Sequence, residues 1–200
     1  MIATPETVLD FWFGAPGTAN EIAGRQRTLW FGKSAANDQL VVERFAETLI
    51  AAGKGELDSW THSPRARLAL IVVLDQFPHH VHRNHGQSFA YDAQSLALAQ
   101  GMIQHGDDAR VAPIERVFAY LPLEHAESMA MQDASVARYE KLAAEADPAE
   151  QGLFEGFLDY ARKHREVVAR FGRFPHRNEL LGRPSTPDEV AFLQQPGSRF

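Results

Sequence analysis

The chain has 200 residues, of which 44% are hydrophobic and 23% are charged, and this composition is typical of a globular protein rather than a disordered one. Its formal net charge of −6 argues against non-specific binding to nucleic acid, which depends on many Lys and Arg side chains that neutralise phosphates. The chain has no cysteine, which excludes disulfides, thiol nucleophiles and thiolate metal ligands and suits a reducing compartment.

The sequence shows neither a membrane span nor a secretion signal. The longest apolar run, residues 68–74, is far shorter than the roughly 20 residues that a spanning helix needs. The N-terminal residues lack a basic segment followed by an apolar one. We therefore expect a cytoplasmic protein that binds no membrane and folds as one domain over residues 1–200. The sequence leaves the oligomeric state open.

A small polar residue followed by proline marks four expected helix starts. The pairs are Thr4-Pro5, Ser63-Pro64, Asp147-Pro148 and Thr186-Pro187. The first residue of each pair caps the helix, and proline fits the first turn. Glu150 and Glu189 complete the spacing of a capping box with Asp147 and Thr186.

No segment shows the sustained two-residue alternation that predicts a strand. The sequence predicts helices at residues 4–12, 20–30, 36–53, 64–76, 88–105, 112–120, 123–145, 148–171 and 187–194, with a short helical turn near 177–181. The apolar run at 68–74 predicts the central buried helix, and a buried parallel strand is the alternative. Short connections favour antiparallel neighbours. We expect an all-α fold in which antiparallel helical hairpins stack as a compact, tetratricopeptide-like superhelical domain, although the sequence pattern of that repeat is absent.

Polar residues gather where three predicted helices end at a proline, in residues 75–84, 121–127 and 173–178. Asp75 is the most informative of them, because a carboxylate at a helix C-terminus faces the negative end of the helix dipole. We expect a nearby donor to compensate it, or Asp75 to act as a general base. The expected donors are Arg173, His176, Arg177 and Asn178.

Two histidines are expected to be buried because each shares a helical face with apolar residues. The face of His164 holds Leu153, Phe157, Tyr160, Val168 and Phe171, and the face of His125 holds Met129, Gln132, Val136 and Tyr139. A buried histidine is most often a hydrogen-bonded core residue, and a pocket role for a neutral imidazole is the alternative.

We expect no metal and no cofactor. Metal-ligand types are present, but the HExxH motif and the Glu-x-x-His pair of di-iron bundles are absent. The histidines at 79, 80, 82 and 85 fit a solvated, pH-sensitive surface better than a chelating site. Glycine-rich nucleotide motifs and the GxSxG elbow are absent as well.

The segment 162–183 is basic in an acidic chain, with seven Lys or Arg against two Glu. One interpretation is that these cations pair with acidic residues of neighbouring helices. The other is that they form an anion site.

Three stretches resemble one family of uncharacterised bacterial proteins, domain of unknown function 924. They are LDQFP at 74–78, YLPLEHAES at 120–128 and the long stretch from 160 to 193. The resemblance implies an all-α, tetratricopeptide-like superhelical fold and supplies no activity. The family pattern continues after DQFP with Arg and Asn, whereas this chain has His79 and His80, which leaves Arg83 as the expected cation.

Two functions from different classes follow. The first is a small-molecule site, catalytic or merely binding, whose ligand is expected to be small and anionic. Its acid, base and proton-relay candidates are Asp75, Glu124, His125 and His164; its ligand-contacting candidates are Gln76, Arg83, Arg173, His176, Arg177 and Asn178. Arg173 and Arg177 would clamp the anion. The alternative is an interaction module that accepts a peptide or a partner protein on a concave face. The sequence does not decide whether the protein is an enzyme.

Overall fold

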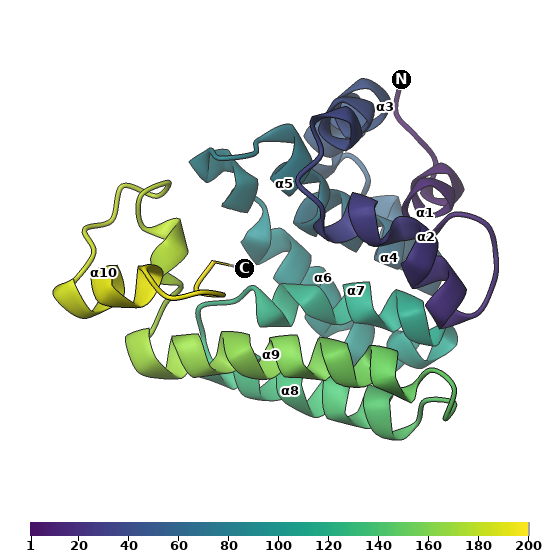
Figure 1. The fold of residues 1–200 in the computed structure, drawn as a ribbon. Helices are drawn as coiled ribbons and strands as arrows, with labels where there is room; N and C mark the ends of the chain where they lie inside the picture. The colour runs from purple at the N-terminus through teal and green to yellow at the C-terminus, as the bar shows by residue number, and fades with distance from the viewer. Residues whose placement is uncertain (200) are drawn as a thin grey trace.

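The computed structural model describes residues 1–199, and its regular structure in that range is entirely helical (Figure 1). The α-helices are α1 (Pro5–Phe13), α2 (Ala19–Phe31), α3 (Ala35–Gly53), α4 (Pro64–Asp75), α5 (Phe77–Val81), α6 (Asp92–Gln104), α7 (Pro113–Glu124), α8 (Met129–Ala144), α9 (Gln151–Phe171) and α10 (Pro187–Leu193). Short 3-10 turns are η1 (Asp58–His62), η2 (Gly86–Phe89), η3 (Asp107–Arg110) and η4 (Pro175–Arg177).

Three of the four predicted helix starts are confirmed. The side-chain oxygens of Thr4, Ser63 and Thr186 each accept a hydrogen bond from a backbone N–H in the first turn of their helix. The start at Asp147 is wrong, because its carboxylate accepts from the Ala149 amide at 2.9 Å and closes a local turn before α9 begins.

The idea that proline ends three helices is wrong at Pro122, whereas α4 does end before Pro78, at Asp75. Pro122 lies inside α7, so the helix predicted to stop at residue 120 continues to Glu124, and the next one begins at Met129 rather than 123. Pro78 lies in the first turn of a short helix that was not predicted, α5. The helix predicted from residue 88 begins at Asp92, after the turn η2.

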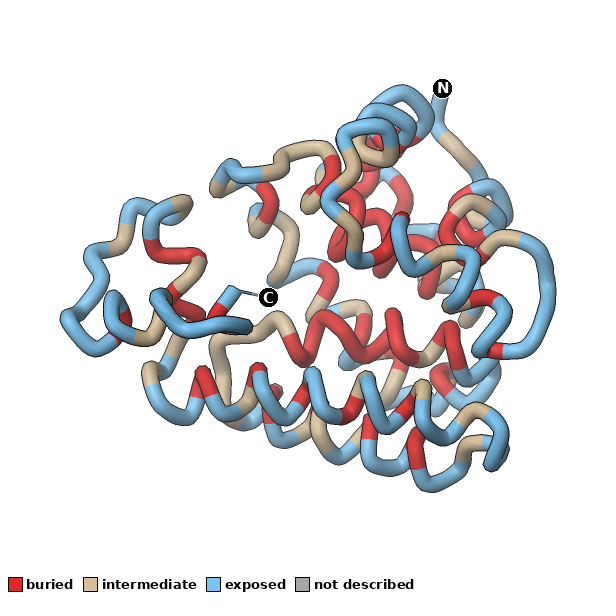
Figure 2. Tube along the Cα trace, in the orientation of Figure 1, coloured by how far each residue is buried: buried red, intermediate tan, exposed pale blue. Residues whose placement is uncertain are grey.

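The central element is α4, which packs against α1, α3, α6 and α7. Every residue from Leu68 to Leu74 is buried, as predicted, and the alternative of a strand is wrong. Figure 2 shows the buried residues concentrated on the inner helices, while the outward sides of α8 and α9 are exposed. The all-α fold is therefore the expected one, and stacking of the hairpins into a superhelix stays a prediction.

The C-terminal part of the chain packs on this body through a second, smaller cluster. Val167, Val168 and Phe174 are its buried members, with Met129, Phe171 and Phe192 packed against them. In Figure 1 α9 runs beside α8, and the yellow segment with α10 lies beyond the end of α9. None of the described helices is long and apolar enough to cross a membrane.

Candidate functional site

Asp75 is the last residue of α4 and is almost completely buried, with 1% of its surface exposed. Its Oδ1 lies 3.0 Å from Nδ1 of His125 and accepts from the hydroxyl of Ser95 at 3.4 Å. Its Oδ2 accepts from Nε2 of Gln76 at 2.5 Å. The expectation that Asp75 is compensated is therefore confirmed, but the expected donors in residues 173–178 are wrong.

His125 follows the last residue of α7, where a cation faces the negative end of the helix dipole. Burial opposes protonation of the imidazole, but the Asp75 carboxylate outweighs it and raises the pKa of His125. Burial would likewise raise the pKa of Asp75, but the charge and hydrogen bond of His125 lower it. Each side chain thus favours the charged form of the other.

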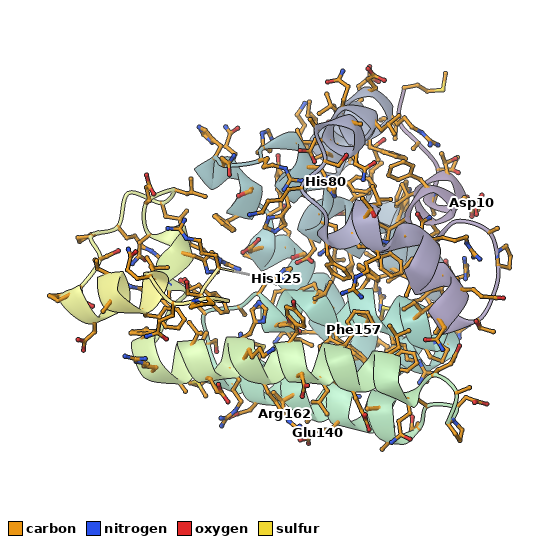
Figure 3. The ribbon with its side chains drawn as sticks, in the orientation of Figure 1. Asp10, His80, His125, Glu140, Phe157 and Arg162 are labelled. Atoms are coloured by element: carbon orange, nitrogen blue, oxygen red, sulfur yellow. The ribbon has the colours of Figure 1, made fainter. Side chains whose placement is uncertain are left out.

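The exposure of the two partners differs. The side chain of His125 is 17% exposed, against 1% for that of Asp75, so burial of His125 is only partial. Its Nδ1 faces Asp75, which leaves Nε2 as the ring nitrogen on the opposite side. In Figure 3, His125 lies between the teal helices of the core and the yellow C-terminal segment. His125 precedes α8, so its predicted face on that helix does not exist.

Glu124 and His164 form a second pair beside the first. Oε1 of Glu124 lies 3.0 Å from Nδ1 of His164, which also donates to the Tyr160 carbonyl at 2.9 Å. Burial raises the pKa of Glu124 to about 8 and lowers that of His164 to about 3. Both side chains are therefore neutral at pH 7, and their contact is not an ion pair.

His164 is buried as predicted, with 6% of its surface exposed. Its helical face agrees only in part with the predicted one. Val168 is buried as predicted, but Tyr160 is 56% exposed, and the other buried residues of α9 are Phe154, Leu158, Ala161 and Val167.

Three imidazole rings lie in a row, with that of His125 in the middle. The ring centroids of His79 and His125 are 5.8 Å apart, and those of His125 and His164 are 6.4 Å apart. Burial, followed by the nearby His125 charge, lowers the pKa of His79 to about 3. Of these three rings, His125 alone has a raised pKa, whereas the pKa values of His79 and His164 are lowered to about 3.

Arg177 is held at the edge of this group between two aromatic faces. Its guanidinium carbon lies 4.5 Å from the ring centroid of Phe89 and 4.7 Å from that of Phe174. Nη1 donates to Oδ2 of Asp92 at 3.0 Å. Burial raises the pKa of Asp92 to about 6, although Arg177 lowers it. We call the group of Asp75, Asp92, Glu124, His125, His164 and Arg177 the Asp75-His125 site.

Of the other predicted ligand residues, Gln76 donates to Asp75, whereas the described hydrogen bonds and ion pairs of Arg83, Arg173 and Asn178 go to residues outside this group. Arg173 makes a two-pronged ion pair with Glu189 at 2.6 and 2.8 Å, and Asn178 donates to Glu189 and Ser185. The anion clamp of Arg173 and Arg177 stays a prediction, and these contacts do not favour it, because each arginine holds a different internal carboxylate.

Arg83 binds Asp38 through two hydrogen bonds of 2.5 Å, next to His80. This places it against α3 rather than in the site. Gln76 lies in the site, as predicted, because its side chain donates to Asp75. His176 lies next to Arg177, and its pKa falls to about 3 because of burial and then the Arg177 charge.

The basic segment 162–183 is largely neutralised within the protein. Arg162 pairs with Glu140, Arg165 with Asp133 and Arg183 with Glu127. The interpretation that acidic residues of neighbouring helices balance this segment fits these contacts.

Sequence reasoning missed Asp92, Ser95, His79, Phe89 and Phe174. Asp92 has one sequence signal, because acidic residues are favoured in the first turn of a helix. The predicted helix begins at residue 88, however, whereas α6 begins at Asp92, so the signal does not stand out. Among residues 1–199, no three His, Asp or Glu side chains converge as metal ligands would.

Comparison with known proteins finds similarity but no activity. The family model described as a bacterial protein of unknown function, DUF924, matches residues 8–197. A solved structure of ATU0120 from Agrobacterium tumefaciens, a protein of unknown function, is similar with 36% sequence identity and a TM-score of 0.78. The alignment covers 95% of this chain and 96% of that one. No curated protein matches.

Proposed function

This chain belongs to the DUF924 family of bacterial proteins of unknown function, and we propose that it binds a small polar molecule at the Asp75-His125 site and exchanges a proton with it. The observation that carries the proposal is the hydrogen bond between the buried Asp75 and Nδ1 of the more exposed His125. A carboxylate in this position fixes the orientation and tautomer of an imidazole, whose Nε2 then serves as general acid or base.

A second support is the separation of the carboxyl pKa values within one site. The pKa of Asp75 is lowered by the His125 cation, whereas burial raises that of Glu124 to about 8. At neutral pH one carboxyl group is therefore ionised and the other is protonated. Sites that perform acid-base chemistry commonly hold two titratable groups whose environments separate their pKa values in this way.

The roles follow from these charges. His125 in its protonated form donates the Nε2 proton to the bound molecule, and Asp75 stays ionised and stabilises the imidazolium. Glu124 is a neutral donor held in place next to His164. Gln132 fixes the end of α7, because its Nε2 donates to the carbonyls of Glu124 and Ala126.

The charge balance of the site favours an uncharged polar substrate. His125 is paired with Asp75, and Arg177 is paired with Asp92, so the two cations already have internal partners. An anion would have to compete with these carboxylates. We therefore replace the anionic ligand expected from the sequence with a neutral one in this proposal.

The proposal also includes two expectations from the sequence. One is a cytoplasmic location. The other is the alternative function, an interaction module for a peptide or protein. It would use a face of the helical array and would not depend on His125.

The proposal is tested by a thermal-shift screen with a panel of uncharged polar compounds, namely small amides, polyols and sugars. We expect at least one compound to raise the melting temperature of the wild type, because a ligand that binds only the folded state stabilises it by about 2.7 kcal/mol at 100 times Kd. His125→Gln should lose that increment. His62→Gln, which changes an exposed histidine, should keep it.

A panel in which no compound separates wild type from His125→Gln contradicts the proposal. A shift that depends equally on His62 and His125 also contradicts it, since that pattern would come from a general effect on histidine content.

A further inference from the structure

A cavity of about 210 Å³ lies on another part of the molecule, where the end of α6, the turn η3, α7 and α8 meet. Its lining residues are Ile103, Gly106, Asp108, Ala109, Arg116, Tyr120, Arg138, Lys141, Leu142 and Glu145. None of them belongs to the Asp75-His125 site. At about 30 Å³ for each water in the liquid, the cavity has room for about seven water molecules.

Arg116 is held firmly at this cavity. Its Nε donates to the Val111 carbonyl and its Nη2 to the Ala109 carbonyl, each at 3.2 Å. These two bonds fix the plane of the guanidinium group. The remaining nitrogen, Nη1, lies 4.0 Å from a carboxylate oxygen of Glu145, which is too long for a hydrogen bond.

Two further cations line the same cavity. Nη1 of Arg138 lies 3.5 Å from Oδ2 of Asp108, and Nζ of Lys141 lies 3.7 Å from Glu145. The Asp108 oxygen is already engaged, because it accepts the Tyr120 hydroxyl at 2.7 Å. Three cations therefore share two carboxylates, and none of them makes a short bond to either one.

Of the two carboxylates, that of Glu145 is the one that a ligand can displace. Its side chain is 52% exposed, whereas Asp108 is buried with 7% of its surface exposed. Exposed ion pairs contribute little stability, so the Glu145 side chain can move into solvent at small cost. A ligand that brings its own negative charge would then meet Arg116, Arg138 and Lys141 together.

We propose that this cavity binds a small anion, a phosphate or carboxylate group, through Arg116, Arg138 and Lys141. The anion takes the place of the Glu145 carboxylate and makes shorter bonds than it does. Charge-assisted bonds from fixed guanidinium groups are the strongest that such a group makes in proteins. The excess of one positive charge at the lining contrasts with the net charge of −6 of the whole chain. The inference does not depend on the function proposed for the Asp75-His125 site.

The test is a titration with sodium phosphate, and separately with sodium succinate, at constant ionic strength maintained with sodium chloride. Binding is followed by calorimetry and by melting temperature. We expect saturable binding to the wild type. Arg138→Gln should weaken it about tenfold, because one charge-assisted contact is lost. Glu145→Gln should strengthen it several-fold, because the competing carboxylate is removed.

Arg162→Gln is the matched control, since Arg162 forms an exposed ion pair with Glu140 away from the cavity lining. It should bind as the wild type does. Phosphate also stabilises proteins without binding a site, and that effect would act equally on all four proteins. An equal response of all four proteins to both anions overturns the proposal, and so does unchanged or weaker binding by Glu145→Gln, a surface substitution that leaves the fold intact. The succinate arm shows whether phosphate or carboxylate is the preferred group.

Discussion

Asp75→Ala is expected to lower the free energy of unfolding by about 3 kcal/mol at pH 7, since removing one partner of a buried ion pair typically costs about 3–5 kcal/mol. Asp75 accepts bonds from His125, Gln76 and Ser95. All three donors would lose that acceptor, and the partly buried His125 would lose its counter-charge. Urea denaturation monitored by circular dichroism measures the loss.

The matched control for this substitution is Asp133→Ala. Asp133 also accepts from a cation, Nε of Arg165 at 2.6 Å, but both side chains are exposed. Its removal should change the free energy of unfolding by no more than about 1 kcal/mol. If the two substitutions lower the free energy of unfolding equally, the buried pair of Asp75 and His125 stabilises the protein no more than an exposed pair does.

Glu124→Gln is expected to remove a pH dependence of stability. Burial raises the pKa of Glu124 from its ordinary 4.5 to about 8 in the folded protein. Between these values the folded state holds a proton that the unfolded state has released. The stabilising effect of that proton is complete below the unfolded pKa and is lost as the pH rises through the folded one.

Glutamine has no such proton to lose and keeps a carbonyl oxygen next to His164. The stability of Glu124→Gln relative to the wild type should therefore increase from pH 5 to pH 8, by up to about 1.4 kcal/mol per pH unit, and level off above that range. Chemical denaturation of both proteins across this range measures the difference. Both proteins share the titrating groups His79, His125 and Asp92. Their contributions to the pH dependence therefore cancel in the difference between the two free energies of unfolding.

Glu140→Gln serves as the control, because Glu140 is exposed in its pair with Arg162. Its stability relative to the wild type should not change in the same way with pH. If Glu124→Gln tracks the wild type at every pH, Glu124 is ionised in the folded protein and its assigned role as a neutral donor is wrong.

Most of the fold could be predicted because its signals are local. The Thr-Pro and Ser-Pro pairs mark helix starts through capping, and an apolar run without polar interruption indicates a helix buried on all sides. The errors occur where packing overrides a local rule. Pro122 is tolerated inside α7, whose residues around it are buried against α4, α6 and α8.

The site was only half predictable for a related reason. The dipole conflict at Asp75 is visible in the sequence, and so is the concentration of polar residues at 121–127. The partner of Asp75 is not visible, because His125 lies 50 positions away and reaches it only when α4 packs on α7. The pair of Asp92 and Arg177 spans 85 positions. The cavity at Arg138 depends in the same way on how α8 meets α7 and η3.

The central claim is that Asp75 holds His125 as the proton-carrying group of this site, and titration of the histidine side chains by NMR tests it most directly. In the wild type, we expect the pKa of His125 to lie above its ordinary value of 6.5 and those of His79 and His164 to lie near 3. Asp75→Asn keeps an oxygen acceptor of the same shape but removes the charge, so burial then dominates and the pKa of His125 should fall below 6.5. A His125 pKa that is the same in both proteins, or below 6.5 in the wild type, would contradict the account.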